Sequence, residues 1–145
     1  MLKTKDRIRN TINIFANSFD LKDWDALKSV LAASVYSDYR DLRGTAEVVT
    51  RSDYVSGRIK ALADLQTHHL FSNYQVSIEN QQAECILSSV IWRQNGNSTF
   101  TTHAIYNFKL KSSEGNWRIH AIKQNVLWNE GDSSIHSAVV IEPKN

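Results

Sequence analysis

The spacing of apolar residues in the first part of the chain predicts three helices. Apolar positions that recur every three or four residues mark one face of a helix over roughly residues 4–19. Asp23 can cap a second helix, and Thr50 with Asp53 resembles a capping box that opens a third. The apolar positions of the three helices are Ile8, Ile12, Phe15 and Phe19, then Trp24, Leu27, Val30 and Leu31, and finally Val55, Ile59 and Leu62.

β-branched and aromatic residues predict the strands, most of them in the second half of the chain. The hairpin signal Asn95-Gly96-Asn97 and the turn around Gly115 separate three long strands that form an antiparallel meander. Helices that precede a run of strands are typical of an α+β fold. The predicted strands are residues 35–42, 71–79, 83–93, 99–111 and 117–127.

The predicted strands are apolar on both faces, as when Leu87 and Ile91 alternate with Val90 and Trp92. A sheet with one face in water shows a cleaner alternation of apolar and polar residues. We therefore expect a curved antiparallel sheet wrapped around the N-terminal helices as a cone with an open mouth. A second copy of the chain would cover part of the outer face, so a homo-oligomer is expected. An apolar cone is a natural site for a small-molecule ligand.

Composition and charge narrow the function classes. The 145 residues carry a net charge of +2 with no basic stripe, which argues against a nucleic-acid partner. No apolar run approaches the length of a membrane span, and residues 1–6 lack the apolar stretch of a signal peptide. The single Cys85 fits a reducing compartment, so a cytoplasmic protein is expected, and its apolar strand suggests a buried, inert thiol.

Asp20 and the pair His68-His69 are the first candidates for chemistry. Asp20 follows the apolar face that ends at Phe19, so it either lies near the interior of the cone or is a solvated helix-end carboxylate. Adjacent strand residues point to opposite sides, so one histidine can face the pocket while the other faces solvent or a neighbouring subunit. A neutral imidazole is the natural general base near neutral pH, and a carboxylate on its other nitrogen fixes its tautomer.

Further candidates are single residues. His103 could be a second acid or base, or could be satisfied within the sheet. Tyr39 and Tyr54 could polarise a carbonyl, and Arg93 could bind an acidic group, although core tyrosines and strand-end arginines are common. The histidines are dispersed along the chain and there is a single cysteine, so no metal site is expected. The sequence contains no nucleotide-binding fingerprint, so no cofactor is expected.

Several stretches of the chain resemble the scytalone dehydratase family, which belongs to the SnoaL-like branch of the nuclear-transport-factor-two-like superfamily. The resemblance is specific over residues 15–40, and it is weaker in the other segments, although together they touch most of the chain. The matching segments are Phe15 to Leu27, Ser37-Asp38-Tyr39-Arg40, Thr67-His68-His69, Gly115 to Ile119 and Val126-Leu127-Trp128.

The resemblance implies a catalytic pair of Asp20 and His69 inside the cone, a pair that also recurs in a related dehydrochlorinase. It implies that Tyr39 polarises a substrate carbonyl through water. Phe19 stands where the family has a tyrosine, and Arg93 falls near the family's second histidine. His103 and Ile105 correspond roughly to a serine and an asparagine of the family. The expected substrate-binding residues are Phe19, Trp24, Tyr54, Arg93 and Ile105.

These observations predict a cofactor-free lyase of the dehydratase type, or an isomerase, that acts on a cyclic or polyketide-like molecule. His69 would remove a proton, Asp20 would orient it, Tyr39 would stabilise the oxyanion, and His103 would protonate the leaving group. A non-catalytic binding module and an accessory subunit, like the small subunits of ring-hydroxylating dioxygenases, are the alternatives. Residues 1–145 would form one domain, with 129–145 as a tail or short lid, and family analogy favours a trimer, then a dimer.

Overall fold

The first two helices form where the apolar spacing predicts them, except that Leu31, which was expected in the second helix, begins the first strand. The computed structural model describes residues 3–140 of the chain. Helix α1 (Thr4–Leu21) ends at Lys22, whose left-handed backbone (φ 52°) turns the chain. The Asp23 carboxylate then accepts a hydrogen bond from the Ala26 amide at 3.1 Å and caps α2 (Trp24–Val30). None of the helices in the described range combines the length and the apolar character of a membrane-spanning segment.

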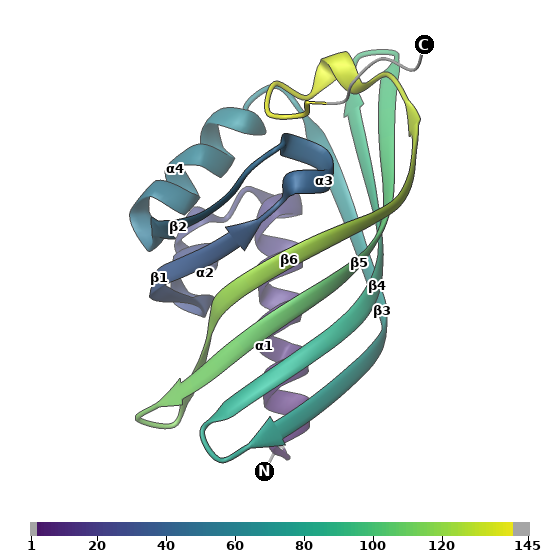
Figure 1. Ribbon diagram of the computed structural model, residues 1–145. Helices are drawn as coiled ribbons and strands as arrows, with labels where there is room; N and C mark the ends of the chain where they lie inside the picture. The colour runs from purple at the N-terminus through teal and green to yellow at the C-terminus, as the bar shows by residue number, and fades with distance from the viewer. Residues whose placement is uncertain (1–2, 141–145) are drawn as a thin grey trace.

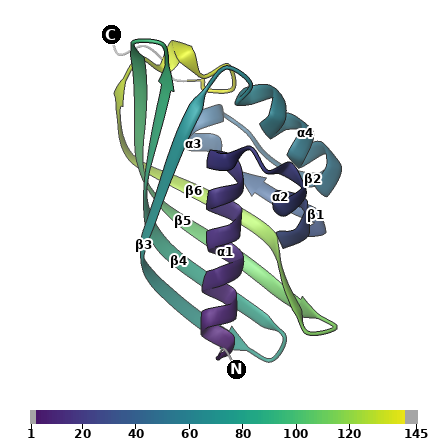
Figure 2. The same ribbon diagram turned by 180° about the vertical axis from the view of Figure 1, so that it is seen from behind.

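Six strands form one curved sheet that wraps around α1, as Figures 1 and 2 show. The order across the sheet is β2-β1-β6-β5-β4-β3. All neighbours run antiparallel except β1 and β6, which run parallel. This arrangement confirms the α+β fold and the predicted meander. The strands are β1 (Leu31–Asp38), β2 (Ala46–Thr50), β3 (Gln66–Glu79), β4 (Gln82–Asn95), β5 (Ser98–Ser113) and β6 (Asn116–Gly131).

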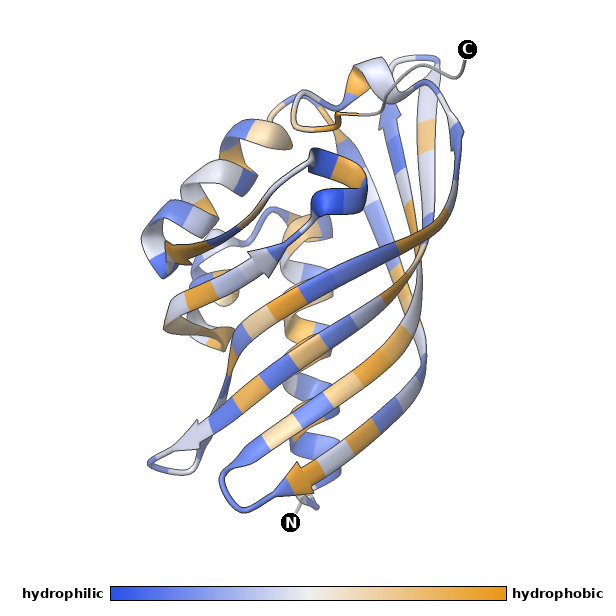
Figure 3. Ribbon diagram, in the orientation of Figure 1, coloured by the Kyte–Doolittle hydropathy of each residue, from blue (hydrophilic) through white to orange (hydrophobic). Residues whose placement is uncertain are grey.

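The core lies between α1 and the concave face of the sheet. Figure 3 shows the alternation of apolar and polar residues along the strands, and the apolar residues of α1 face the same core. The Phe15 ring meets the Phe108 ring edge to face at a centroid distance of 5.2 Å, and Phe15 also contacts Phe19. Buried aromatic pairs of this geometry add to the burial of apolar area. Cys85 is fully buried in the same core.

The segment between β1 and α4 differs from the sequence prediction. A strand was expected over residues 35–42, but β1 already ends at Asp38, and Arg40–Arg43 form the short helix α3. The Asp38 carboxylate accepts hydrogen bonds from the Arg40 amide and guanidinium, which draws the chain into this turn. Gly44 ends α3 with a positive φ of 76°. The edge strand β2 follows and was not predicted. Thr50 caps α4 (Arg51–Ala61) as expected, by accepting from the Asp53 amide at 3.1 Å.

The C-terminal part crosses the open end of the curved sheet. Strand β6 continues to Gly131, and a 3₁₀ helix, η1 (Ser133–Ile135), follows it. Figure 1 shows η1 at the end of the molecule where α3 and the last turn of α4 lie. The Val140 amide donates to the Leu42 carbonyl at 2.8 Å, which ties the segment to α3. Of the tail predicted over residues 129–145, the first three residues belong to β6, and residues 141–145 lie outside the described residues.

Candidate active site

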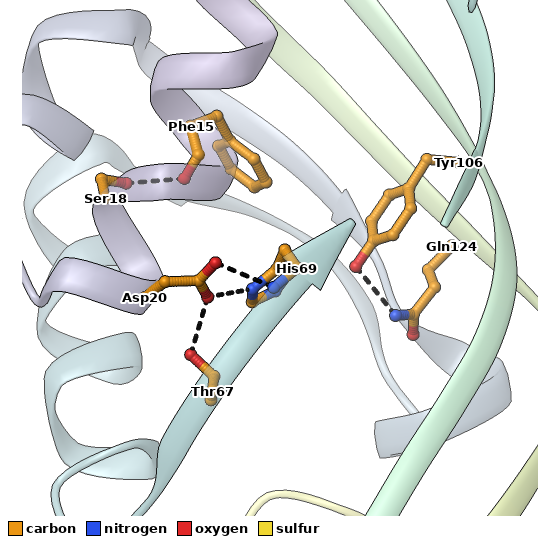
Figure 4. Close-up of polar contacts among 7 residues, drawn as sticks. All are labelled: Phe15, Ser18, Asp20, Thr67, His69, Tyr106 and Gln124. Carbon is orange, nitrogen blue, oxygen red and sulfur yellow. Dashed lines mark hydrogen bonds and ion pairs between the residues drawn. The ribbon is translucent and has the colours of Figure 1, made fainter. Parts of the chain in front are cut away.

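Asp20 and His69 form a hydrogen-bonded pair at the end of α1 (Figure 4). The Asp20 Oδ1 atom lies 2.6 Å from His69 Nδ1 and 2.9 Å from the Thr67 hydroxyl, and its Oδ2 atom accepts from the His69 amide at 2.8 Å. Thr67 and His69 stand two residues apart in β3, so both side chains face α1. A carboxylate in the last turn of a helix opposes the helix dipole, and three donors from one strand offset that cost.

The Asp20 contact determines the tautomer of His69. An ionised carboxylate can only accept hydrogen bonds, so Nδ1 carries the proton and Nε2 keeps its lone pair. Burial lowers the pKa of His69 below 6.5, although the hydrogen bond to Asp20 opposes this shift. Side-chain exposures of 6% for His69 and 14% for Asp20 agree with that burial. At neutral pH His69 is therefore a neutral base whose free nitrogen is Nε2.

His69 lines a cavity of about 30 Å³ at the open end of the sheet. That volume is about the share of one water molecule in the liquid. The cavity walls come from α1, α3, α4, β3, β4, β5, β6 and the segment after η1. The lining residues are Phe19, Tyr39, Leu42, Arg43, Arg58, Leu62, Thr67, His69, Ile91, Arg93, Tyr106, Gln124 and His136. The site is narrow as it stands, and its walls are more polar than the core below it.

Tyrosine and amide groups supply hydrogen-bonding atoms to this cavity. The Tyr39 and Tyr54 hydroxyls lie 2.9 Å apart, and burial raises the pKa of Tyr54 well above 10. Gln124 Nε2 donates to the Tyr106 hydroxyl at 2.9 Å, across the cavity from His69 in Figure 4. Within residues 3–140 the buried Gln124 Oε1 has no hydrogen-bond partner. These groups can hold polar atoms of a ligand.

Three arginines converge on the same cavity. The pKa of Arg58 is lowered to about 10, mainly by burial and secondly by the charge of Arg43. Burial also lowers the pKa of Arg93 to about 10. Both guanidiniums therefore remain charged at neutral pH. The three charges also act on His136, whose pKa falls to about 3, chiefly because the ring is buried. His136 is 4% exposed and belongs to the segment that closes the cavity.

The structure brings together only part of the predicted site. Phe19, Tyr39, His69 and Arg93 line the cavity, Asp20 stands behind His69, and Tyr54 reaches the cavity through Tyr39.

Trp24, by contrast, packs against Phe19 at a centroid distance of 6.4 Å and does not line the cavity. His103 and Ile105 lie on the other face of β5, because Thr102, Ala104 and Tyr106 point inward. The His103 ring stacks on Trp128 at 4.1 Å, on the outer face of the sheet.

Sequence reasoning missed most of the lining residues, which are the apolar Leu42, Leu62 and Ile91 and the polar or aromatic Thr67, Arg43, Arg58, Tyr106, Gln124 and His136. Thr67 could have been found, because it stands two positions before His69 on the same strand face. The two further arginines lie on α3 and α4, whose orientation no local pattern specifies. Among residues 3–140, no group of three or more histidine, cysteine, aspartate and glutamate side chains could hold a metal ion.

Comparisons with known proteins agree with this fold. The family model of the SnoaL-like domain matches residues 1–123. No curated protein sequence matches the chain. Among solved structures, the Kfla4162 protein from Kribbella flavida is 18% identical, with a TM-score of 0.86 over 90% of this chain and 95% of that one.

Two further structures have names that describe elimination enzymes. A candidate scytalone dehydratase from Novosphingobium aromaticivorans is 11% identical, with a TM-score of 0.77 over 87% of this chain and 85% of that one. A hexachlorocyclohexane dehydrochlorinase is 13% identical, with a TM-score of 0.78 over 93% of both chains. At these identities the likeness supports the fold.

Proposed function

The chain belongs to the SnoaL-like domain family, and we propose that it is a lyase or isomerase in which His69 removes a proton from a small molecule. The observation that carries this proposal is the 2.6 Å contact between Asp20 Oδ1 and His69 Nδ1 beside a cavity. The contact leaves Nε2 as a free base. The names of a dehydratase-like and a dehydrochlorinase structural relative are consistent with proton abstraction.

In the proposed step, Nε2 takes a proton from a carbon next to a carbonyl group. The electrons of that C–H bond form the C=C bond of an enolate. In an elimination they then expel a leaving group from the next carbon, and in an isomerisation the proton returns at another carbon. Asp20 stabilises the imidazolium that forms on His69. No metal or cofactor takes part in this proposed step.

Tyr39 is the proposed donor to the developing oxyanion. Its hydroxyl lies 2.9 Å from that of Tyr54, and one of the two must donate to the other. If Tyr54 donates, the proton of Tyr39 is free to point into the cavity. Tyr54 would then be a positioning residue, and one such donor is commonly worth about 3 kcal/mol in the transition state.

The cavity must open for this function, because about 30 Å³ cannot admit a cyclic molecule. The segment over residues 132–140 is the proposed lid. It carries His136 into the cavity. Its backbone is held to the rest of the fold by two hydrogen bonds, one from the Asp132 amide to the Thr99 carbonyl and one from the Val140 amide to the Leu42 carbonyl. So few attachments are consistent with local opening.

Proton abstraction can be tested before a substrate is known. The protein is incubated in D₂O with a panel of cyclic ketones and β-hydroxy carbonyl compounds, and mass spectrometry measures deuterium uptake and loss of water. The wild type should catalyse exchange or elimination, and His69→Gln should lose about 10²–10⁴-fold in rate. His68→Gln is the matched control, because His68 stacks on Trp92 on the outer face. Equal rates in the wild type and His69→Gln would remove His69 from the mechanism.

An accessory, non-catalytic role is the second candidate. Two observations favour it: the cavity is only about 30 Å³, and large apolar side chains are exposed on the sheet. This role predicts no exchange with any member of the panel, and no loss of function on changing His69. The hydrogen-bonded pair of Asp20 and His69 favours catalysis, because it leaves His69 Nε2 as a free base beside the cavity.

We also propose a homo-oligomer, in which a second copy of this chain covers the outer face of the sheet. Leu70, Trp92 and Trp128 are 53%, 43% and 50% exposed there. Trp92 stacks on His68 and Trp128 stacks on His103, so each tryptophan ring is partnered on one side within the chain. Light scattering coupled to size exclusion should give a dimer or trimer for the wild type and a smaller species for Trp92→Glu. A monomeric wild type would contradict the proposal.

A further inference from the structure

The cavity holds more positive charge than the described part of the protein neutralises. Arg43, Arg58 and Arg93 all line it. Four ion pairs occur among residues 3–140, and none of them includes these three arginines. The Asp20 carboxylate, which belongs to the same site, is already occupied by His69 and Thr67.

Each guanidinium also has unused donors. Arg93 is 4% exposed, and within the described chain its one side-chain hydrogen bond is from Nη1 to the Thr102 hydroxyl at 2.8 Å. All three guanidiniums also make cation–π contacts, Arg93 over the Phe100 ring at 5.1 Å, Arg43 over the Tyr39 ring at 3.5 Å and Arg58 over the Tyr54 ring at 6.0 Å. A guanidinium has five N–H donors, so most of those in the cavity remain available.

The charges act on one another through the cavity. Arg43 lowers the pKa of Arg58, and both lower the pKa of Arg93. Like charges held together in a poorly hydrated site lower the stability of the folded state. An arrangement of this kind gains stability when an anion enters, and guanidinium groups suit the two oxygens of a carboxylate.

We infer that the cavity binds a carboxylate between Arg43, Arg58 and Arg93, so that the substrate is a small carboxylic acid with an acidic C–H bond. The identification of this anion as part of a substrate rests on the proposed function, whereas the binding of a carboxylate does not. His69 and Tyr39 line the same cavity, so a carboxylate held by the arginines leaves the remainder of the molecule beside the base.

Formate and benzoate are suitable probes, and formamide and benzamide are their neutral counterparts of nearly the same shape. Backbone amide signals of Arg43, Arg58 and His69 would be followed by NMR at pH 7.5 during titration of each compound. The carboxylates should shift these signals with saturation, whereas the amides should not. Formate needs little more room than the present cavity offers, so failure of both carboxylates to bind would overturn the inference.

Variants then locate the binding. Arg58→Gln and Arg93→Gln should each weaken carboxylate binding by about tenfold or more, because each removes a charge-assisted contact. The melting temperature of the ligand-free variants should equal or exceed that of the wild type, because a repelling charge is gone. Arg9→Gln is the matched control, since Arg9 pairs with Asp6 at 3.0 Å on an exposed part of α1. Unchanged affinity in both cavity variants, or an equal loss in Arg9→Gln, would contradict the inference.

The His69→Gln variant separates this inference from the proposed function. His69 is neutral at the pH of the titration, so this variant should still bind benzoate. Carboxylate binding without any His69-dependent exchange would leave the inference standing and refute the proposed catalysis. The reverse result, exchange without carboxylate binding, would refute the inference alone.

Discussion

Lowering the pH should release the segment over residues 132–140 from the cavity. His136 is the reason, because its pKa is about 3 in the closed structure and returns to its ordinary value near 6.5 when the segment opens. Below pH 6.5 the open form therefore binds more protons than the closed form, and closure weakens as pH falls. Protonation would place a fourth positive charge among Arg43, Arg58 and Arg93.

The size of the effect follows from the shift in pKa. Closure should lose about 1.4 kcal/mol for each pH unit below 6.5. At pH 5.0 the loss is about 2 kcal/mol, which raises the ratio of open to closed molecules about 30-fold. Above pH 7 both forms hold a neutral imidazole, so the ratio should no longer change with pH on account of His136.

Hydrogen exchange followed by mass spectrometry measures this opening directly. Peptides that cover residues 132–140 are compared between the wild type and His136→Gln at pH 7.5 and pH 5.0. The comparison at each pH cancels the chemical dependence of exchange on pH. The wild type should gain about 30-fold in relative exchange at pH 5.0, and His136→Gln should not. His103→Gln, a change on the outer face, should behave as the wild type. A wild type that opens no more than His136→Gln at pH 5.0 would refute the reasoning.

Three further predictions follow from single contacts. Asp20→Asn leaves the donors of Thr67 and His69 poorly matched, so it should lower the free energy of unfolding, measured with urea, by about 2 kcal/mol. An unchanged urea midpoint would contradict the role of these contacts. In the wild type, kcat/KM on any active panel compound should fall as pH drops below 6.5, with a midpoint below 6.5. The Asp20→Asn midpoint should lie lower still, because Asp20 raises the pKa of His69, and a midpoint that moves upward would oppose this assignment. Gly131→Ala should lower the melting temperature strongly, since Gly131 has φ 93° and a Cβ would lie 2.2 Å from the Thr99 carbonyl oxygen. Gly57→Ala in α4, with open space around it, should stabilise the protein by up to about 1 kcal/mol, and a similar response of both variants would argue against the contact.

Local patterns were sufficient for much of the fold. Apolar residues recur with the helical period in α1 and at alternate positions in the strands of the meander. Turn residues such as Gly96 and Gly115 separate the strands. Helix α3 and strand β2 are too short to show a period. They depend on the Asp38–Arg40 ion pair and on pairing with β1, which are contacts that a local pattern does not reveal.

The site was predictable only where neighbouring residues share a face or where the family resemblance supplied the pair. Asp20 and His69 came from that resemblance together with the helix and strand pattern. His103 and Ile105 were misplaced because the resemblance was followed against the alternation of β5. Thr102, Ala104 and Tyr106 are the inward residues of that strand, so its odd-numbered neighbours must face outward.

The position of the cavity follows from a difference in length between α1 and the sheet. Helix α1 stops at Leu21, while the strands continue past it toward η1. The inward positions that face the helix are apolar, as where Phe108 meets Phe15. The inward positions beyond its end include polar residues, such as Arg93 and its hydrogen-bond partner Thr102. One strand alternation therefore builds both the core beside the helix and the cavity beyond it, and the segment that carries His136 lies across this end of the sheet.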